Sequence, residues 1–139
     1  EPYNINDCDT DSFNDTDAAK LSEMDDEHDA AKVLWGDDWR MPTLTDFAEL
    51  IDHCTFGSKV IDGITCGVFT SKVNNQKIVM PPAGYVNSGA LIVRGDVGFY
   101  WSMSFGSSEL AWSISFGPGG RSVDTNGRYI GFSVRPVRS

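Results

Sequence analysis

The sequence has few of the residues that most enzymes and metal sites use. It contains two histidines, His28 and His53, and three cysteines among 139 residues. It has no H-E-x-x-H, C-x-x-C, G-x-S-x-G, P-loop or G-x-G-x-x-G pattern, so the common zinc, redox, serine-nucleophile and phosphate-binding sites lack their signatures. We therefore expect a protein that is not an enzyme and that needs no metal or other cofactor.

Long apolar runs and basic stripes are also missing. No stretch approaches the roughly 20 apolar residues of a membrane helix, which predicts that this chain does not insert directly into a membrane. Acids outnumber bases by 20 to 11, and no segment gathers Lys and Arg at the density that phosphate binding requires. This charge distribution excludes nucleic acid as the expected partner.

The three cysteines are an odd number, so at least one thiol stays unpaired within the chain. Cys54 and Cys66 are the nearest pair in sequence. One disulfide between them and two simple buried thiols are equally compatible with the sequence, and the state of Cys8 is open as well. The cysteines therefore do not indicate a redox compartment.

The chain divides into an acidic lead-in and one folded domain. Residues 1–20 are rich in Asp and Asn and predict irregular structure. Residues 21–139 are long and apolar enough to bury a core as a single domain. Because the chain starts at Glu1 without a cationic apolar signal, we expect a processed or excised domain whose targeting segment lies upstream.

The first half predicts two short helices. Ser22 followed by Asp25 resembles a capping box, and Gly36 is a good helix stop. Between them lies an apolar stripe made of Ala30, Ala31, Val33 and Leu34. The first helix is therefore expected between Ser22 and Gly36.

Thr43 and Asp46 open the second helix in the same way. Apolar residues then recur every three or four positions, which is typical of a helix with one face in a core. These residues are Leu44, Phe47, Leu50, Ile51 and Cys54.

From Gly57 onward, short β-branched and aromatic runs between turn residues predict a meander of strands. The expected strands lie at residues 60–61, 65–71, 78–80, 90–93, 98–102 and 111–116. Alternation in the last of these predicts that Ser113 and Ser115 face outward. The residues predicted to face inward are Trp112, Ile114 and Phe116, followed by Ile130, Phe132 and Val134. Helices followed by such a meander indicate an α+β fold.

Residues 102–129 combine many small polar side chains with scattered aromatic and arginine residues. This composition is typical of adaptable binding surfaces, in which a few aromatic or Arg side chains supply most of the binding energy. An ordinary polar sheet exterior with Gly-Ser turns explains the same composition equally well. Composition alone leaves both interpretations open.

A linked series of short motifs resembles a known family. The motifs are residues 29–31 (DAA), 35–43 (WGDDWRMPT), 49–50 (EL), 70–72 (TSK), 80–85 (MPPAGY), 100–102 (YWS), 111–112 (AW), Phe116 and 131–137 (GFSVRPV). In this order and spacing they resemble the Fibrobacter succinogenes major paralogous domain, which is common in secreted and surface proteins of Bacteroidetes-type bacteria. The resemblance covers roughly residues 21–139.

That family is similar to the C-type lectin fold, the scaffold of the variable proteins of diversity-generating retroelements. The resemblance implies a fixed framework and a C-terminal part that displays ligand-binding residues. The implied framework residues are Trp101, Trp112, Phe116, Arg128, Phe132 and Arg135. The implied ligand-binding residues are Met103, Phe105, Ser113, Ser115, Arg121, Ser122, Asp124, Thr125, Asn126, Tyr129 and Ile130.

The resemblance also implies a function. The chain is expected to be a non-enzymatic module that binds a protein or glycan ligand at the bacterial or phage surface. The alternative is a structural or adhesion domain of a surface or fimbrial protein, without a specific pocket of its own. The calcium-dependent sugar motifs of animal C-type lectins are missing, so binding of sugar through calcium is not implied.

Overall fold

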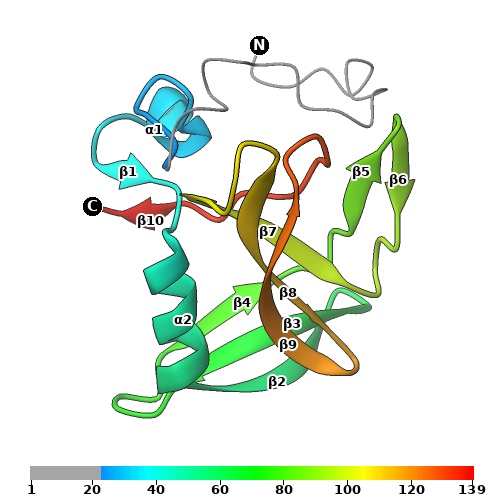
Figure 1. Cartoon of the computed structure of the whole chain (residues 1–139). Helices are drawn as coiled ribbons and strands as arrows, with labels where there is room; N and C mark the ends of the chain where they lie inside the picture. The colour runs from blue at the N-terminus through cyan, green and yellow to red at the C-terminus, as the bar shows by residue number, and fades with distance from the viewer. Residues whose placement is uncertain (1–22) are drawn as a thin grey trace.

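The computed structural model describes residues 23–139. The predicted lead-in at residues 1–20, together with Ser22 and Cys8, lies outside the described residues. The first elements are α1 (Ala30–Trp35), β1 (Trp39–Arg40) and α2 (Leu44–His53). They are followed by β2 (Cys54–Ile61), β3 (Ile64–Ser71), β4 (Lys77–Met80), β5 (Tyr85–Asn87), β6 (Ala90–Ile92), β7 (Gly98–Phe105), β8 (Leu110–Gly117), β9 (Gly120–Gly127) and β10 (Val137–Arg138). Two short helices and a run of strands confirm the α+β class (Figure 1).

The strands form small antiparallel sheets. The two larger sheets have the strand orders β2–β3–β4 and β7–β8–β9, and β5 forms a separate hairpin with β6. β1 pairs with β10, so residues 39–40 lie beside residues 137–138 from the other end of the described chain. Figure 1 shows this pair next to α1 and above α2.

The main core lies where α2 and the two three-stranded sheets meet. Its buried side chains are Phe47, Phe69, Met80, Tyr100, Ile114 and Phe116. The Phe116 ring lies directly against the backbone of both sheets, because a Cβ atom at Gly67 would come within 2.6 Å of the ring and one at Gly98 within 2.2 Å. A side chain at either glycine would therefore displace the Phe116 ring from its place in the core.

The first helix begins later than predicted and buries less. Asp29, not Ser22, is the N-cap of α1, and Gly36 ends the helix with φ +95°, as expected. Val33 and Leu34 are 56% and 60% exposed, so the predicted burial of the apolar stripe is wrong for these two residues. Only Ala31 is fully buried in this six-residue helix, because α1 is too short to press more than one turn against the body.

The second helix confirms its prediction. Thr43 and Asp46 form a reciprocal capping box at the start of α2. Phe47 is buried in the main core, and Leu50 and Ile51 pack against it. α2 has ten residues, and among residues 23–139 no helix has the length and apolar character that crossing a membrane requires.

One strand near the C-terminus was missed. Residues 120–127 were not expected to form a strand, yet they form β9 in full register with β8. Residues 130–134 do not form a strand, because they make only isolated bridges through Gly131 and Ser133. The inward direction of this segment is nevertheless confirmed for Ile130, Phe132 and Val134, which pack against a second core cluster around Trp101.

Cys54 and Cys66 are both free thiols. Cys66 pairs across the sheet with Lys59, which is five residues from Cys54. The two cysteines are therefore about 17 Å apart along the hairpin, far beyond the roughly 7 Å between Cα atoms that a disulfide allows. Of the two open alternatives, the structure selects unbridged thiols for this pair.

The buried Asp29 carboxylate gives a stability prediction. The side chain is 1% exposed and accepts hydrogen bonds from the backbone N–H groups of Ala31 (2.9 Å), Lys32 (3.1 Å) and Met41 (3.0 Å). D29A leaves these donors without an acceptor, and we expect it to lower the free energy of unfolding by about 2–4 kcal/mol in urea denaturation. D38N, at an exposed acid, is the control, and equal stability of D29A and D38N would contradict the prediction.

Asp46 gives a pH prediction. Burial raises the pKa of Asp46, whereas hydrogen bonds from the Arg40 guanidinium and the Thr43 backbone lower it. The lowering effects together are larger, so the pKa of Asp46 lies below its ordinary value. A lowered carboxyl pKa stabilises the fold above about pH 4, and this stability is lost as the pH falls through the folded-state pKa. We expect D46N to be less stable than wild type in urea at pH 7, with the difference shrinking at pH 3. A constant difference between the two pH values would contradict this origin.

Candidate functional site

Five of the predicted ligand-binding residues lie on one face of the β8–β9 hairpin. The strand register places Ser115 opposite Ser122 and Ser113 opposite Asp124, and Asn126 is two residues further along β9. Side chains at alternate positions of a strand share a face. We call these five residues the polar row.

The polar row is tied together by hydrogen bonds. The hydroxyl oxygens of Ser115 and Ser122 are 3.1 Å apart. The Asn126 amide donates to Ser113 Oγ at 2.9 Å, and Ser113 Oγ donates to the Asp124 carbonyl at 3.3 Å. Ser122 and Asp124 are exposed, whereas Ser115 and Asn126 are half-buried. The accessible part of the row therefore offers a hydroxyl and a carboxylate.

Ser113 corrects the sequence prediction. It points to the predicted face but is 1% exposed, so it is not part of the accessible surface. Its cross-strand neighbour on β7 is the large Trp101, and Asn126 reaches over it from β9. The alternation gave the direction of Ser113 correctly, but larger neighbours on the adjacent strands cover so small a side chain.

Aromatic rings border the polar row on the side of β7. Phe99 pairs with Ser115 and Trp101 pairs with Ser113, so both rings belong to the same face. Phe132 stacks on Trp101 with ring centroids 4.2 Å apart and on Phe99 at 4.9 Å, and Tyr85 meets Phe99 edge-on at 5.2 Å. Phe99, Phe132 and Tyr85 are half-buried. Sequence reasoning missed Tyr85 and Phe99 as neighbours of the site, although period-two alternation in residues 98–102 could have paired Phe99 with Trp101.

Arg121 and Thr125 lie on the other side of β9. They alternate with the polar row and share their side with Val123, which packs against the main core. Arg121 is exposed near the β8–β9 turn, and Tyr129 lies beyond the opposite end of the strand. The strand between them spans about 20 Å. The structure therefore does not bring Arg121 together with Tyr129 or with the polar row.

The other predicted residues have framework contacts. Met103, Phe105 and Ile130 pack against the cluster around Trp101. The Arg128 guanidinium lies 3.6 Å from the centre of the Phe105 ring and donates to the Ser108 carbonyl at 3.1 Å.

Tyr129 is half-buried, and its ring lies so close to Gly127 that a Cβ atom there would come within 2.5 Å of it. These contacts give Met103, Phe105, Ile130 and Tyr129 packing roles in the chain.

The expected framework residues make such contacts too. Trp101, Phe116 and Arg128 are each buried. Trp101 Nε1 donates to the Ile130 carbonyl at 3.2 Å. Arg135 is exposed, but it donates to the Val79 carbonyl at 3.2 Å. Trp112 and Phe132 are half-buried.

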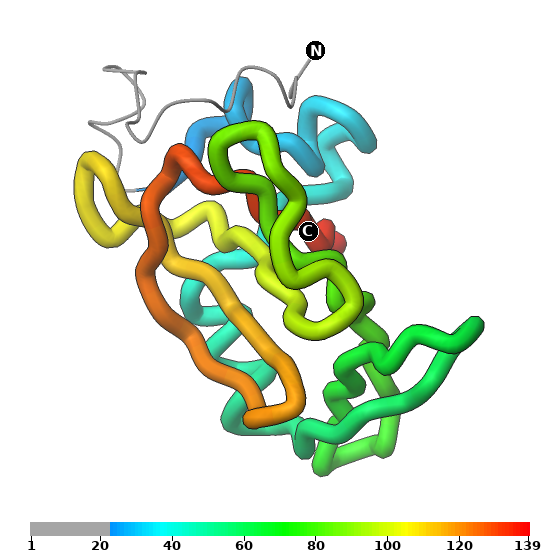
Figure 2. Tube along the Cα trace, turned by 90° about the vertical axis from the view of Figure 1, so that its right-hand side faces the viewer, coloured from blue at the N-terminus to red at the C-terminus, as the bar shows by residue number. Residues whose placement is uncertain are grey.

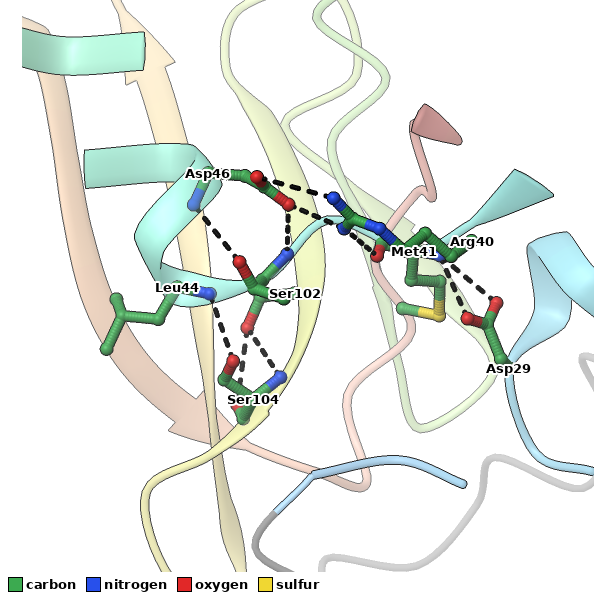
Figure 3. A network of polar contacts seen from close by, with 8 residues as sticks. Asp29, Arg40, Met41, Leu44, Asp46, Ser102 and Ser104 are labelled. Carbon is green, nitrogen blue, oxygen red and sulfur yellow. Dashed lines mark hydrogen bonds and ion pairs between the residues drawn. The ribbon is translucent and has the colours of Figure 1, made fainter. Parts of the chain in front are cut away.

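A network of backbone and serine groups holds β7 in place beneath the face (Figure 3). The register of β7 against β8 shifts between Trp101 and Phe105. Within this irregular stretch, Ser102 Oγ donates to the Trp112 carbonyl at 2.6 Å, and Ser104 Oγ accepts from the Leu44 N–H at 3.0 Å. The start of α2 therefore anchors the strand that carries the aromatic border.

The face combines hydrogen-bonding side chains with aromatic rings. Asp124 is the one ionisable side chain of the polar row, and its carboxylate accepts a hydrogen bond from the Thr125 backbone at 2.8 Å. No group of three or more His, Cys, Asp or Glu side chains that could hold a metal ion occurs in residues 23–139. The side chains of the row can donate and accept hydrogen bonds, and the neighbouring rings add apolar contact area.

Comparison with known proteins finds no matching family model, no similar curated protein and no similar solved structure. The function of the chain is therefore inferred from the geometry of this face and from the motifs that resemble the family named above.

The contrast between Ser113 and Ser122 gives a test of the face. S113Y forces a large side chain into a fully enclosed position, and we expect it to lower the free energy of unfolding by about 2 kcal/mol or more. S122Y adds the same side chain at an exposed position of the neighbouring strand and should change the stability by less than about 0.5 kcal/mol. Urea denaturation of both variants measures the difference, and equal tolerance of the two tyrosines would contradict the burial of Ser113.

Proposed function

We propose that the chain is a non-enzymatic ligand-binding module on a C-type-lectin-like scaffold, and that its ligand is a protein or glycan. The polar row and its aromatic border would form the binding face. The observation that carries this proposal is the convergence of Ser115, Ser122, Asp124 and Asn126 on one accessible side of two paired strands. Of the eleven predicted ligand-binding residues, these four share this accessible side, whereas Arg121 and Thr125 lie on the other side of β9.

The difference between the two sides of the β7–β8–β9 sheet also supports the proposal. The side of the sheet opposite the polar row carries Tyr100 and Ile114 in the main core, so this side holds the sheet rigid. The polar-row side also packs, because Trp101 and Ala111 on it belong to the second core cluster. Ser122 and Asp124 are exposed, so substitutions at these two positions are expected to leave both core clusters unchanged. A rigid sheet with a tolerant face is the arrangement that a display surface needs.

The chemistry of the row limits the ligand. Asp124 brings one negative charge, and no ion pair of Asp124 occurs among residues 23–139. A ligand group opposite Asp124 is therefore expected to be a hydrogen-bond donor, either neutral or cationic. The half-buried rings would add contact area at little cost in side-chain entropy.

The proposed location is outside the cell, at the surface of a bacterium or phage. This location follows from the family resemblance of the motifs in residues 29–43 and 131–137.

Capture experiments with matched variants test the binding face. The probes are an array of immobilised glycans and a panel of extracellular proteins. We expect the double variant S122A/D124A to weaken capture at least tenfold while the melting temperature stays within about 2 °C of wild type. R121A, on the other side of the same strand, is the matched control and should bind as wild type does. Equal binding of all three proteins would refute the proposed face.

A structural or adhesion domain without its own pocket is the second candidate. It is favoured because side chains of the polar row form hydrogen bonds with each other, Ser115 with Ser122 and Ser113 with Asn126. Such pairs also stabilise an ordinary sheet exterior. Absence of capture across both probe sets, with a fully folded chain, would select this candidate.

A further inference from the structure

The strand β2 is an edge of the β2–β3–β4 sheet that a single charged side chain, Lys59, protects. All eight of its residues pair with β3 in continuous register, and β2 contains no proline. The opposite edge is protected, because Arg135 donates to the Val79 carbonyl of β4 at 3.2 Å and Pro81 follows that strand. Natural sheets normally blunt their edges with several devices, such as prolines, bulges and charged side chains, and Lys59 is the only one of these in β2, so this long regular edge calls for an explanation.

Ser58 and Val60 direct their backbone polar groups away from β3. The two-residue turn at Asp62 and Gly63 has φ +51° and +79°, and such a turn is flanked by a hydrogen-bonded pair, here Ile61 and Ile64. Every second residue back from Ile61 bonds to β3, and the intervening residues face outward. Among residues 23–139, the backbone groups of Ser58 and Val60 have no hydrogen-bond partner.

Apolar side chains gather at the end of the same hairpin. Val60 is 63% exposed, Ile64 is 46% exposed and Ile61 is 36% exposed. Figure 2 shows the β2–β3 hairpin projecting from the body and diverging from the β8–β9 hairpin. An exposed edge with apolar side chains beside it is typical of a surface that pairs with another chain.

Gly57 is the second observation that points to a neighbour. It lies inside β2 with an ordinary extended backbone, and a Cβ atom there would have nothing within 4 Å among the described residues. Packing within the chain therefore gives no reason for a glycine at this position. Glycine inside a strand weakens it and often marks the close approach of another backbone.

We propose that β2 pairs with β2 of a second copy of this chain, antiparallel and about a two-fold axis at Ser58. In this register Ser58 faces Ser58 of the second copy, and Phe56 faces Val60 of the second copy. The outward backbone groups of both strands then bond to each other. The two three-stranded sheets become one six-stranded sheet, and the interface is closed because both copies use the same surface.

The charge of Lys59 argues against one alternative register. Lys59 is the only ionised side chain of the strand. An axis at Lys59 would place two lysines directly opposite each other, which is unfavourable. The axis at Ser58 places each Lys59 opposite Gly57 of the second copy, where no side chain opposes it. This register therefore explains the glycine and avoids the like-charge pair.

The dimer is expected to be weak and sensitive to salt. One strand edge and two hairpin ends bury less than the roughly 1,600 Å² of a standard stable interface. Each chain carries a net charge of −9, so two copies repel at long range, and salt screens this repulsion. Association should therefore increase with protein concentration and with ionic strength. This inference is independent of the proposed ligand-binding face.

Sedimentation velocity of the whole chain over a range of concentrations tests the pairing. We expect a concentration-dependent dimer that S58P weakens at least tenfold. Proline at position 58 removes an N–H group that faces outward, so the ladder with β3 is kept and the circular dichroism spectrum should match wild type. S58A keeps the backbone donor, is the matched control and should dimerise as wild type does. A wild-type chain that stays monomeric at all concentrations and salt levels would overturn the proposal.

Cysteine cross-linking tests the register separately, even if S58P fails to fold. Paired residues of an antiparallel ladder have Cα atoms about 5.5 Å apart, within disulfide range, so S58C should cross-link to its copy under mild oxidation. The two Val60 positions would be about 13 Å apart along the strands, so V60C should cross-link no more than wild type, which controls for the native cysteines. Cross-linking of V60C without S58C would refute the axis at Ser58.

Discussion

The buried carboxylate of Asp29 is the interaction on which the arrangement of the chain depends. It caps α1 and at the same time holds the backbone of Met41. Because Pro42 follows directly, this contact sets where the chain turns into the capping box at Thr43 and therefore where α2 begins. The Leu44 N–H at that start bonds to Ser104 of β7, so the position of the proposed binding face is linked to one carboxylate through successive hydrogen bonds.

Local signals predicted those parts of the fold that local interactions decide. The second helix follows from its capping box at Thr43, and the end of the first follows from Gly36. The start of the first helix was misplaced because the choice of Asp29 as cap depends on Met41, a donor 12 residues away. β9 was missed because residues 120–127 have Val123 as their only large apolar residue, and their strand conformation comes from pairing with β8.

At the candidate site, the sequence predicted the direction of side chains but not the residues that surround them. Alternation along β8 predicted the direction of Ser113 and Ser115, since direction depends on the strand alone. It could not predict that Ser113 is buried, because burial depends on Trp101 and Asn126 in neighbouring strands. Tyr85 reaches the face from a separate hairpin, and no pattern within one segment reports such a contact.

The pairing of β1 with β10 has a consequence for the order of folding. Trp39 lies opposite Arg138, and the Ser139 N–H donates to the Asp38 carbonyl at 2.8 Å. During synthesis the segment around Trp39 leaves the ribosome long before its partner strand exists. The β2–β3 hairpin and the β8–β9 hairpin can form from neighbouring residues as they emerge, whereas β1 waits for the last residues of the sequence. Closure of this small sheet therefore comes after both hairpins have formed.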